Sequence, residues 1–195
     1  MKRTHLNALS AALIALAMAA CTQEAPSSAA AEPAAAAVPA AASAASANAD
    51  ELATEQKNLA TFDDLDFNVF SNRKWDELSH SHAKDILVHW PDGHTTTGID
   101  VHIADLEKMF VYAPDTRIKV HPIRIAQGNM TAVSGIMEGT FTQPMPLGDG
   151  KFAQPTGKAF KLPMATIGRW ENGVMQEEWL YWDNQTYMTQ LGLAK

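Results

Sequence analysis

Carboxylates and aromatic side chains gather in one stretch near the end of the sequence. Residues 174–183 read VMQEEWLYWD, so Glu177 and Glu178 stand directly before Trp179. Adjacent residues of a strand point to opposite faces of a sheet, so only one of the two glutamates can enter an interior pocket. A carboxyl group among indole rings loses water, which raises its pKa and suits it to proton transfer. The pattern leaves open which glutamate this is, and a paired carboxylate at a rim is the alternative.

Histidines gather in a second stretch, where four of them fall between residues 80 and 94. His89 and His94 flank Trp90 and a Pro-Asp-Gly turn in the sequence HWPDGH. Imidazole titrates near neutral pH, so either histidine is a candidate hydrogen-bonding or acid–base group. The two imidazoles and the Asp92 carboxylate around this turn could hold a divalent metal, but the spacing matches no strong metal-binding signature, so we expect no metal and no cofactor. The alternative is that these histidines lie on the surface or at the edge of the core.

The two glutamates belong to a predicted β-hairpin over residues 159–183. Asn172-Gly173 supplies the two positions of positive φ that a tight turn needs, and the flanking runs are rich in apolar, β-branched and aromatic residues. Asp183 follows the second strand, where it either fixes the geometry of the site or caps the next turn.

The elements before the hairpin change in period along the chain. Apolar residues recur at helical spacing over residues 51–70 and again from Gly98 until just before Pro114, and a shorter helix is expected over residues 75–82. Residues 85–90 form a short strand-like run, and from Thr116 the period becomes two. Helices followed by antiparallel strands indicate an α+β domain, with a curved antiparallel sheet and helices on one face.

The first 49 residues differ in composition from the remainder. A charged start and an apolar run predict a signal peptide over residues 1–20. The run ends LAMAAC at Cys21, the only cysteine, and resembles the lipobox of bacterial lipoproteins. We therefore expect lipidated Cys21 to anchor the protein to the membrane facing the periplasm, and Thr22 favours the outer membrane by analogy. Cleavage at Ala20 that leaves a free thiol is the alternative.

Residues 21–49 are almost entirely Ala, Pro and Ser, which predicts a disordered tether. Residues 50–195 suit one domain with a single core. A formal charge of −7 without a run of Lys and Arg argues against nucleic-acid binding.

The order of motifs in this domain resembles the SnoaL-like polyketide cyclases, also called ester cyclases, of the nuclear-transport-factor-two-like superfamily. The residues that carry the resemblance are HWPDGHTTTG, then Glu-Asn-Gly-x5-Trp-x3-Asp-x7-Leu-Gly-Leu, within residues 52–193. The resemblance implies a cone: a bent antiparallel sheet wrapped over about three N-terminal helices, with an internal pocket for a small hydrophobic molecule. It also implies a homodimer through the outer face of the sheet.

Some relatives of this kind close polyketide rings without a metal or cofactor, using an aspartate on the last strand. Leu180 stands in that place, and Glu178, one step earlier on the same face, is the best substitute. The leading hypothesis is cofactor-free acid–base catalysis of the isomerase, cyclase or hydrolase type, with Glu178 as base and His89 or His94 orienting a polarised oxygen. Substrate-binding walls would come from four aromatic residues: Trp90, Trp179, Tyr181 and Trp182. The competing hypothesis is a non-catalytic ligand-binding or protein-interaction module on the same fold.

Overall fold

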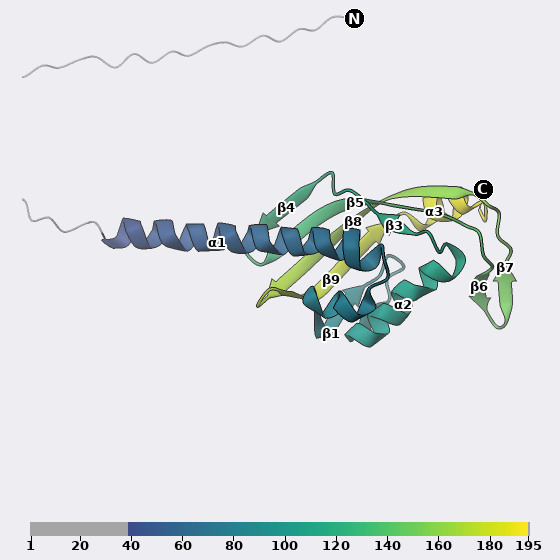
Figure 1. Ribbon diagram of the computed structural model, residues 1–195, viewed down its shortest axis with the longest axis horizontal. Helices are drawn as coiled ribbons and strands as arrows, with labels where there is room; N and C mark the ends of the chain where they lie inside the picture. Colours follow the sequence, from purple (N-terminus) through teal and green to yellow (C-terminus); the bar gives the residue numbers. More distant parts are fainter. Residues whose placement is uncertain (1–38, 195) are drawn as a thin grey trace, which may run out of the picture. The chain divides into compact units, whose positions relative to one another are not determined.

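The computed structural model describes residues 39–194 (Figure 1). The predicted signal peptide, Cys21 and most of the predicted tether lie outside the described residues. Helix α1 spans Pro39–Asp64, so it begins before Glu51, where the periodicity starts. Proline is favoured in the first turn of a helix and alanine has the highest helix propensity, so the last part of the predicted tether continues the helix instead.

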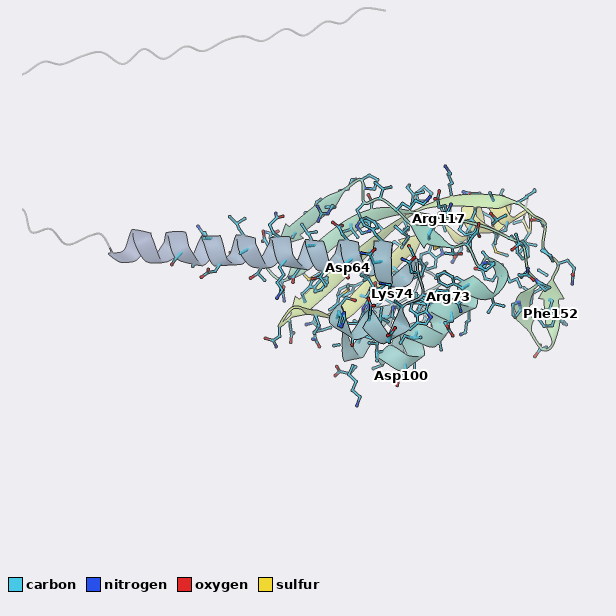
Figure 2. The ribbon with its side chains drawn as sticks, in the orientation of Figure 1. Asp64, Arg73, Lys74, Asp100, Arg117 and Phe152 are labelled. Atoms are coloured by element: carbon cyan, nitrogen blue, oxygen red, sulfur yellow. The ribbon has the colours of Figure 1, made fainter. Side chains whose placement is uncertain are left out.

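Three further helical segments lie before the long hairpin. The π-helical turn η1 (Leu65–Phe70) continues α1, the 3₁₀ helix η2 (Trp75–His80) follows it, and α2 (Ile99–Tyr112) agrees with the predicted third helix. Arg73, in the turn between η1 and η2, ties that turn to α2 (Figure 2). Its guanidinium lies 3.4 Å from Glu107 and 5.3 Å from the ring centroid of Phe110.

Seven strands form one curved sheet in the order β2-β1-β9-β8-β5-β3, with β4 also pairing with β5. Their bounds are β1 His82–His89, β2 Thr95–Thr97, β3 Arg117–Ile118, β4 Arg124–Gln127, β5 Met130–Thr140, β8 Ala159–Glu171 and β9 Val174–Trp182. A separate small hairpin joins β6 (Met145–Gly148) to β7 (Lys151–Ala153), with Phe152 exposed on it (Figure 2). The last helix, α3, spans Asn184–Leu191.

The α+β cone is confirmed, with one difference in strand direction. All pairings in the main sheet are antiparallel except that of β1 with β9, which is parallel. A parallel pair needs a long crossover between its strands, and here most of the domain supplies that connection. Helix α2 packs on β1 and β2, while α1 packs on β4 and β5. Within residues 39–194, no helix combines the length and apolar character needed to cross a membrane.

The predicted hairpin is present as β8 and β9. Asn172 and Gly173 have φ of 53° and 81°, the left-handed values that the turn requires. A β-bulge follows the turn, because Arg169 pairs with Glu177 whereas Trp170 pairs with Met175. The extra residue, Gln176, reverses the alternation of faces along β9.

The bulge decides which glutamate is buried. Sequence alternation places Met175 with Glu177, but in the structure Met175 shares the inner face with Glu178 and Leu180. Glu177 and Tyr181 lie on the outer face. The core beneath the sheet is apolar and aromatic, and its largest fully buried side chains include Phe62, Phe141, Phe160 and Trp170.

We predict that two glycines of β5 differ sharply in their tolerance of alanine. A Cβ on Gly139 would lie 2.8 Å from the buried ring of Phe160, whereas one on Gly135 would meet Ile118 and Met164 at 3.4 Å, an ordinary contact. We expect Gly139→Ala to lower the free energy of unfolding by about 1–3 kcal/mol because of overpacking. The matched control Gly135→Ala should stay within about 1 kcal/mol of the wild type. Urea denaturation measures both, and equal effects would contradict the packing described.

Candidate functional site

A cavity lies between the inner face of the sheet and the helices. The volume open to the centre of a water molecule is about 40 Å³. Its polar lining comes from five elements: Asp66 on η1, His82 on β1, His102 on α2, Glu178 on β9 and Thr166 on β8. The remaining lining residues are apolar or aromatic and include Leu180, Trp90 and Trp182. A few polar groups in an apolar concavity are the usual composition of a ligand site.

Three of these polar residues come together from β1, α2 and β9. His82 opens β1 and is buried like Ile86 and Val88, although the pairing of β1 with β9 is irregular between His82 and Leu87. His102 stands one turn before Leu106 on the buried face of α2. Together with Glu178 they form the His–His–Glu cluster, whose ligand atoms all lie within 4.8 Å of one another.

Side-chain pairing inside the His–His–Glu cluster is incomplete. Glu178 Oε2 lies 3.4 Å from His102 Nε2 and 3.8 Å from His82 Nε2, and neither contact meets hydrogen-bond geometry. All three side chains are at most 5% exposed. Among the described residues, four buried side-chain polar atoms have no hydrogen-bond partner: His82 Nε2, His102 Nδ1, Asp105 Oδ2 and Glu178 Oε2. An unpaired buried polar group costs about 1–3 kcal/mol, so this concentration calls for a functional explanation.

Ser81 contacts the other ring nitrogen of His82. Ser81 Oγ lies 3.1 Å from Leu78 O and 2.9 Å from His82 Nδ1, while His82 Nε2 has no hydrogen-bond partner.

The protonation states in the cluster follow from burial and mutual charge. Burial raises the pKa of Glu178, but His82 and His102 outweigh this and hold that pKa below its usual range. Burial also lowers the pKa of His102, to about 4, against the opposing charge of Glu178. Glu178 is therefore ionised and His102 neutral at neutral pH. The expectation that aromatic surroundings would raise the pKa of Glu178 is wrong, because imidazoles are its neighbours.

A second group of charges runs from Asp66 on the cavity wall toward the surface. Asp66 Oδ2 lies 2.7 Å from His121 Nε2, and His121 Nδ1 lies 2.8 Å from Asp63 Oδ1. Arg124 binds the other oxygen of Asp63 at 2.8 Å. Burial raises the pKa of Asp66 despite the opposing effect of His121, and the charge of Glu178 adds to the rise.

The structure separates the predicted site residues. Trp90 and Trp182 line the cavity with Glu178. His89 does not line the cavity. It follows the buried Val88 on β1 and therefore lies on the opposite face of the strand, where its Nε2 is 2.9 Å from Glu177 Oε1. Its ring stacks on Trp179 at 5.1 Å, so both of these predicted residues lie on the outer face.

The other predicted residues also lie away from the cavity. His94 is exposed, contacts Asp92 and stacks on Trp90. Asp183 caps α3 by accepting hydrogen bonds from the backbone of Gln185 and Thr186, and Tyr181 is 50% exposed. The cap comes from the preference of aspartate for the N-terminus of a helix, the alternative that the sequence left open for Asp183.

Sequence reasoning missed His82, His102, Asp66 and His121. His102 had a usable signal, because it is spaced by four and eight residues from Leu106 and Phe110. Alternation along β1 does not identify His82, since Lys84 is exposed and the pairing with β9 shifts between His82 and Leu87.

The curved sheet, its inner helices and the enclosed cavity define the class of cone-shaped α+β proteins. Within this class, residues 64–191 match the family model for SnoaL-like polyketide cyclase, and the chain belongs to that family. No curated protein gives a significant sequence match.

Solved structures of this family share the fold. A candidate SnoaL-like polyketide cyclase from Jannaschia sp. CCS1 matches with a TM-score of 0.62 at 19% identity, over 72% of this chain and 94% of its own. IdmH, a candidate polyketide cyclase from Streptomyces antibioticus, matches with a TM-score of 0.59 at 21% identity, over 69% of this chain and 98% of its own. A candidate polyketide cyclase from Xanthomonas campestris pv. campestris matches with a TM-score of 0.60 at 16% identity, over 71% of this chain and 98% of its own.

The contacts of His121 make stability depend on pH. Burial lowers the pKa of His121, but hydrogen bonds and charge from Asp66 and then Asp63 outweigh this and raise it. A raised histidine pKa contributes stability fully below the unfolded value of about 6.5, and this contribution is lost as pH rises through the folded value.

We therefore predict a pH-dependent stability difference between the wild type and the double variant His121→Gln/Asp66→Asn, which leaves no lone charge next to the cavity. The double variant should be less stable by about 2 kcal/mol near pH 6.5, and the difference should shrink toward pH 10. Urea denaturation across that range measures it, and the exposed variant His80→Gln serves as control. A difference independent of pH would mean that His121 is neutral.

Proposed function

We propose that the cavity binds a small, mainly apolar molecule and catalyses proton transfer on it, in a reaction of the isomerase, cyclase or hydrolase type. Glu178 is the proposed base, and His82 and His102 take the role that the sequence assigned to His89 or His94. The observation that carries the proposal is the ionised carboxylate of Glu178, buried in an apolar cavity with an oxygen that no protein group binds.

The second carboxylate of the cavity supports an acid–base pair. Burial raises the pKa of Asp66, whereas the histidines lower that of Glu178. Two titratable groups whose surroundings push their pKa values in opposite directions are suited to the roles of acid and base. Asp66 is the proposed acid, and His121 and Asp63 connect it toward the surface.

The size of the cavity limits what enters it without rearrangement. A volume of about 40 Å³ accepts little more than water, whereas sites for organic ligands usually measure about 300 Å³ or more. Met109, Met137 and Met164 line the cavity, and unbranched thioether side chains change rotamer readily. We propose that these methionines move aside when the molecule binds.

The test uses the molecule that the protein itself retains. Native mass spectrometry of the purified protein identifies that molecule, and incubation with it in D₂O reports proton transfer as deuterium incorporation. We expect Glu178→Gln to slow incorporation by about 10²- to 10⁴-fold. The neighbouring control Glu177→Gln, on the outer face, should match the wild type.

A different result supports the competing function. If the wild type retains the molecule but exchanges no deuterium and forms no product, the catalytic proposal fails. Unchanged affinity in Glu178→Gln would then favour the non-catalytic binding module. Leu180, which lines the cavity where the resemblance implies an aspartate, is the observation that keeps this second function open.

We also propose that lipidated Cys21 holds the domain at the periplasmic side of the bacterial membrane. Multiple acyl chains on one residue give stable attachment. We expect Cys21→Ser to move the protein from the membrane fraction to the soluble periplasmic fraction, while the control Thr22→Ser stays with the membrane. Detergent phase partitioning measures this, and unchanged partitioning of Cys21→Ser would contradict it. Pairing through the outer face and the absence of nucleic-acid binding stay predictions.

A further inference from the structure

We propose that the His–His–Glu cluster binds one divalent transition-metal ion, with His82 and His102 supplying imidazole nitrogens and Glu178 a carboxylate oxygen. Two imidazoles and one carboxylate, with open coordination positions, form a donor set that suits zinc and neighbouring divalent metals. The inference rests on the proposed function only in taking the cavity as the ligand site. It differs from the expectation of no metal because the ligating histidines are His82 and His102, not His89 and His94.

The spacing of the donor atoms fits an ion after small movements. Glu178 Oε2 lies 3.4 Å and 3.8 Å from the two Nε2 atoms, and all ligand atoms fall within 4.8 Å of one another. Metal–ligand distances of about 2.1 Å require donor atoms about 3.0–3.5 Å apart. Shifts of about 1 Å or less therefore close the site.

The unpaired atoms of the cluster face one another. Glu178 Oε2 and His82 Nε2 have no hydrogen-bond partner, and the 3.8 Å between them is too long for a hydrogen bond. A cation between them would bind both atoms at once.

Surrounding groups prepare the histidines to bind. Metal-bound histidines usually donate their second ring N–H to an oxygen, which fixes the tautomer. Ser81 Oγ already lies within hydrogen-bond distance of His82 Nδ1, at 2.9 Å. His102 Nδ1 and Asp105 Oδ2 are the other two unpartnered atoms, one turn apart on α2, and a hydrogen bond between them would orient His102 in the same way.

The ion would polarise an oxygen of the molecule in the cavity, in place of the two histidines that hold it.

The test is metal titration of the full-length protein, purified in detergent, stripped with a chelator and dialysed. We expect one Zn²⁺ per chain by calorimetry, and a visible ligand-field spectrum with Co²⁺. His82→Gln, His102→Gln and Glu178→Gln should each weaken Zn²⁺ binding at least 10-fold. The matched controls His80→Gln and Glu177→Gln, an exposed histidine and the outward-facing glutamate, should bind as the wild type does.

A measurement on the wild type keeps the test valid if a variant fails to fold. Imidazole NMR should show Zn²⁺ shifting the signals of His82 and His102 while those of His80 and His89 stay in place. Absence of stoichiometric binding, or binding that His80→Gln removes and His102→Gln retains, overturns the inference. If the protein binds no ion but the metal-free protein still catalyses deuterium exchange, only the metal site is overturned. If the protein binds the ion but catalyses neither exchange nor product formation, only the acid–base proposal is overturned.

Discussion

The burial of an ionised carboxylate at Glu178 is the constraint on which the rest of the site depends. Removing a charge from water costs several kcal/mol even after the surroundings relax. The cone meets this cost with two imidazoles from elements far apart in the chain, β1 and α2, which meet β9 only in the folded domain. Neither imidazole completes a hydrogen bond to the carboxylate, so the arrangement favours an occupant over a closed core. Stability alone would favour apolar residues of similar volume here.

Local chemistry made the hairpin predictable and its bulge unpredictable. Asn172-Gly173 fixes the turn through φ values that other residue pairs rarely adopt, and the flanking strands follow from their composition. The bulge at Gln176 arises from pairing across the sheet, where Met175 meets Trp170 in the core. No alternation in the sequence records that extra residue, so the face of Glu178 could come only from the resemblance and not from the pattern.

The histidines show a different limit of sequence reasoning. The local density around HWPDGH drew attention to His89 and His94, although that segment forms a strand end and an exposed turn. The buried histidines lie twenty residues apart in the chain, and tertiary packing alone brings their rings to 5.1 Å. Proximity in sequence is therefore a poor guide to a site built across a parallel β1–β9 pair, because the whole domain separates its components.

The leucine at position 180 acquires a physical meaning from this arrangement. An aspartate there would place a third carboxylate in a cavity that already holds Glu178 and Asp66. The negative charge of Glu178 already raises the pKa of Asp66. Like charges in a low-dielectric interior cannot all ionise, so a third carboxyl group would have to keep its proton. With an apolar Leu180, the carboxylate of β9 lies two residues earlier on the same inner face, at Glu178. In the proposed function this position compensates for the departure from the family's pattern, because it brings the carboxylate beside the two imidazoles of His82 and His102.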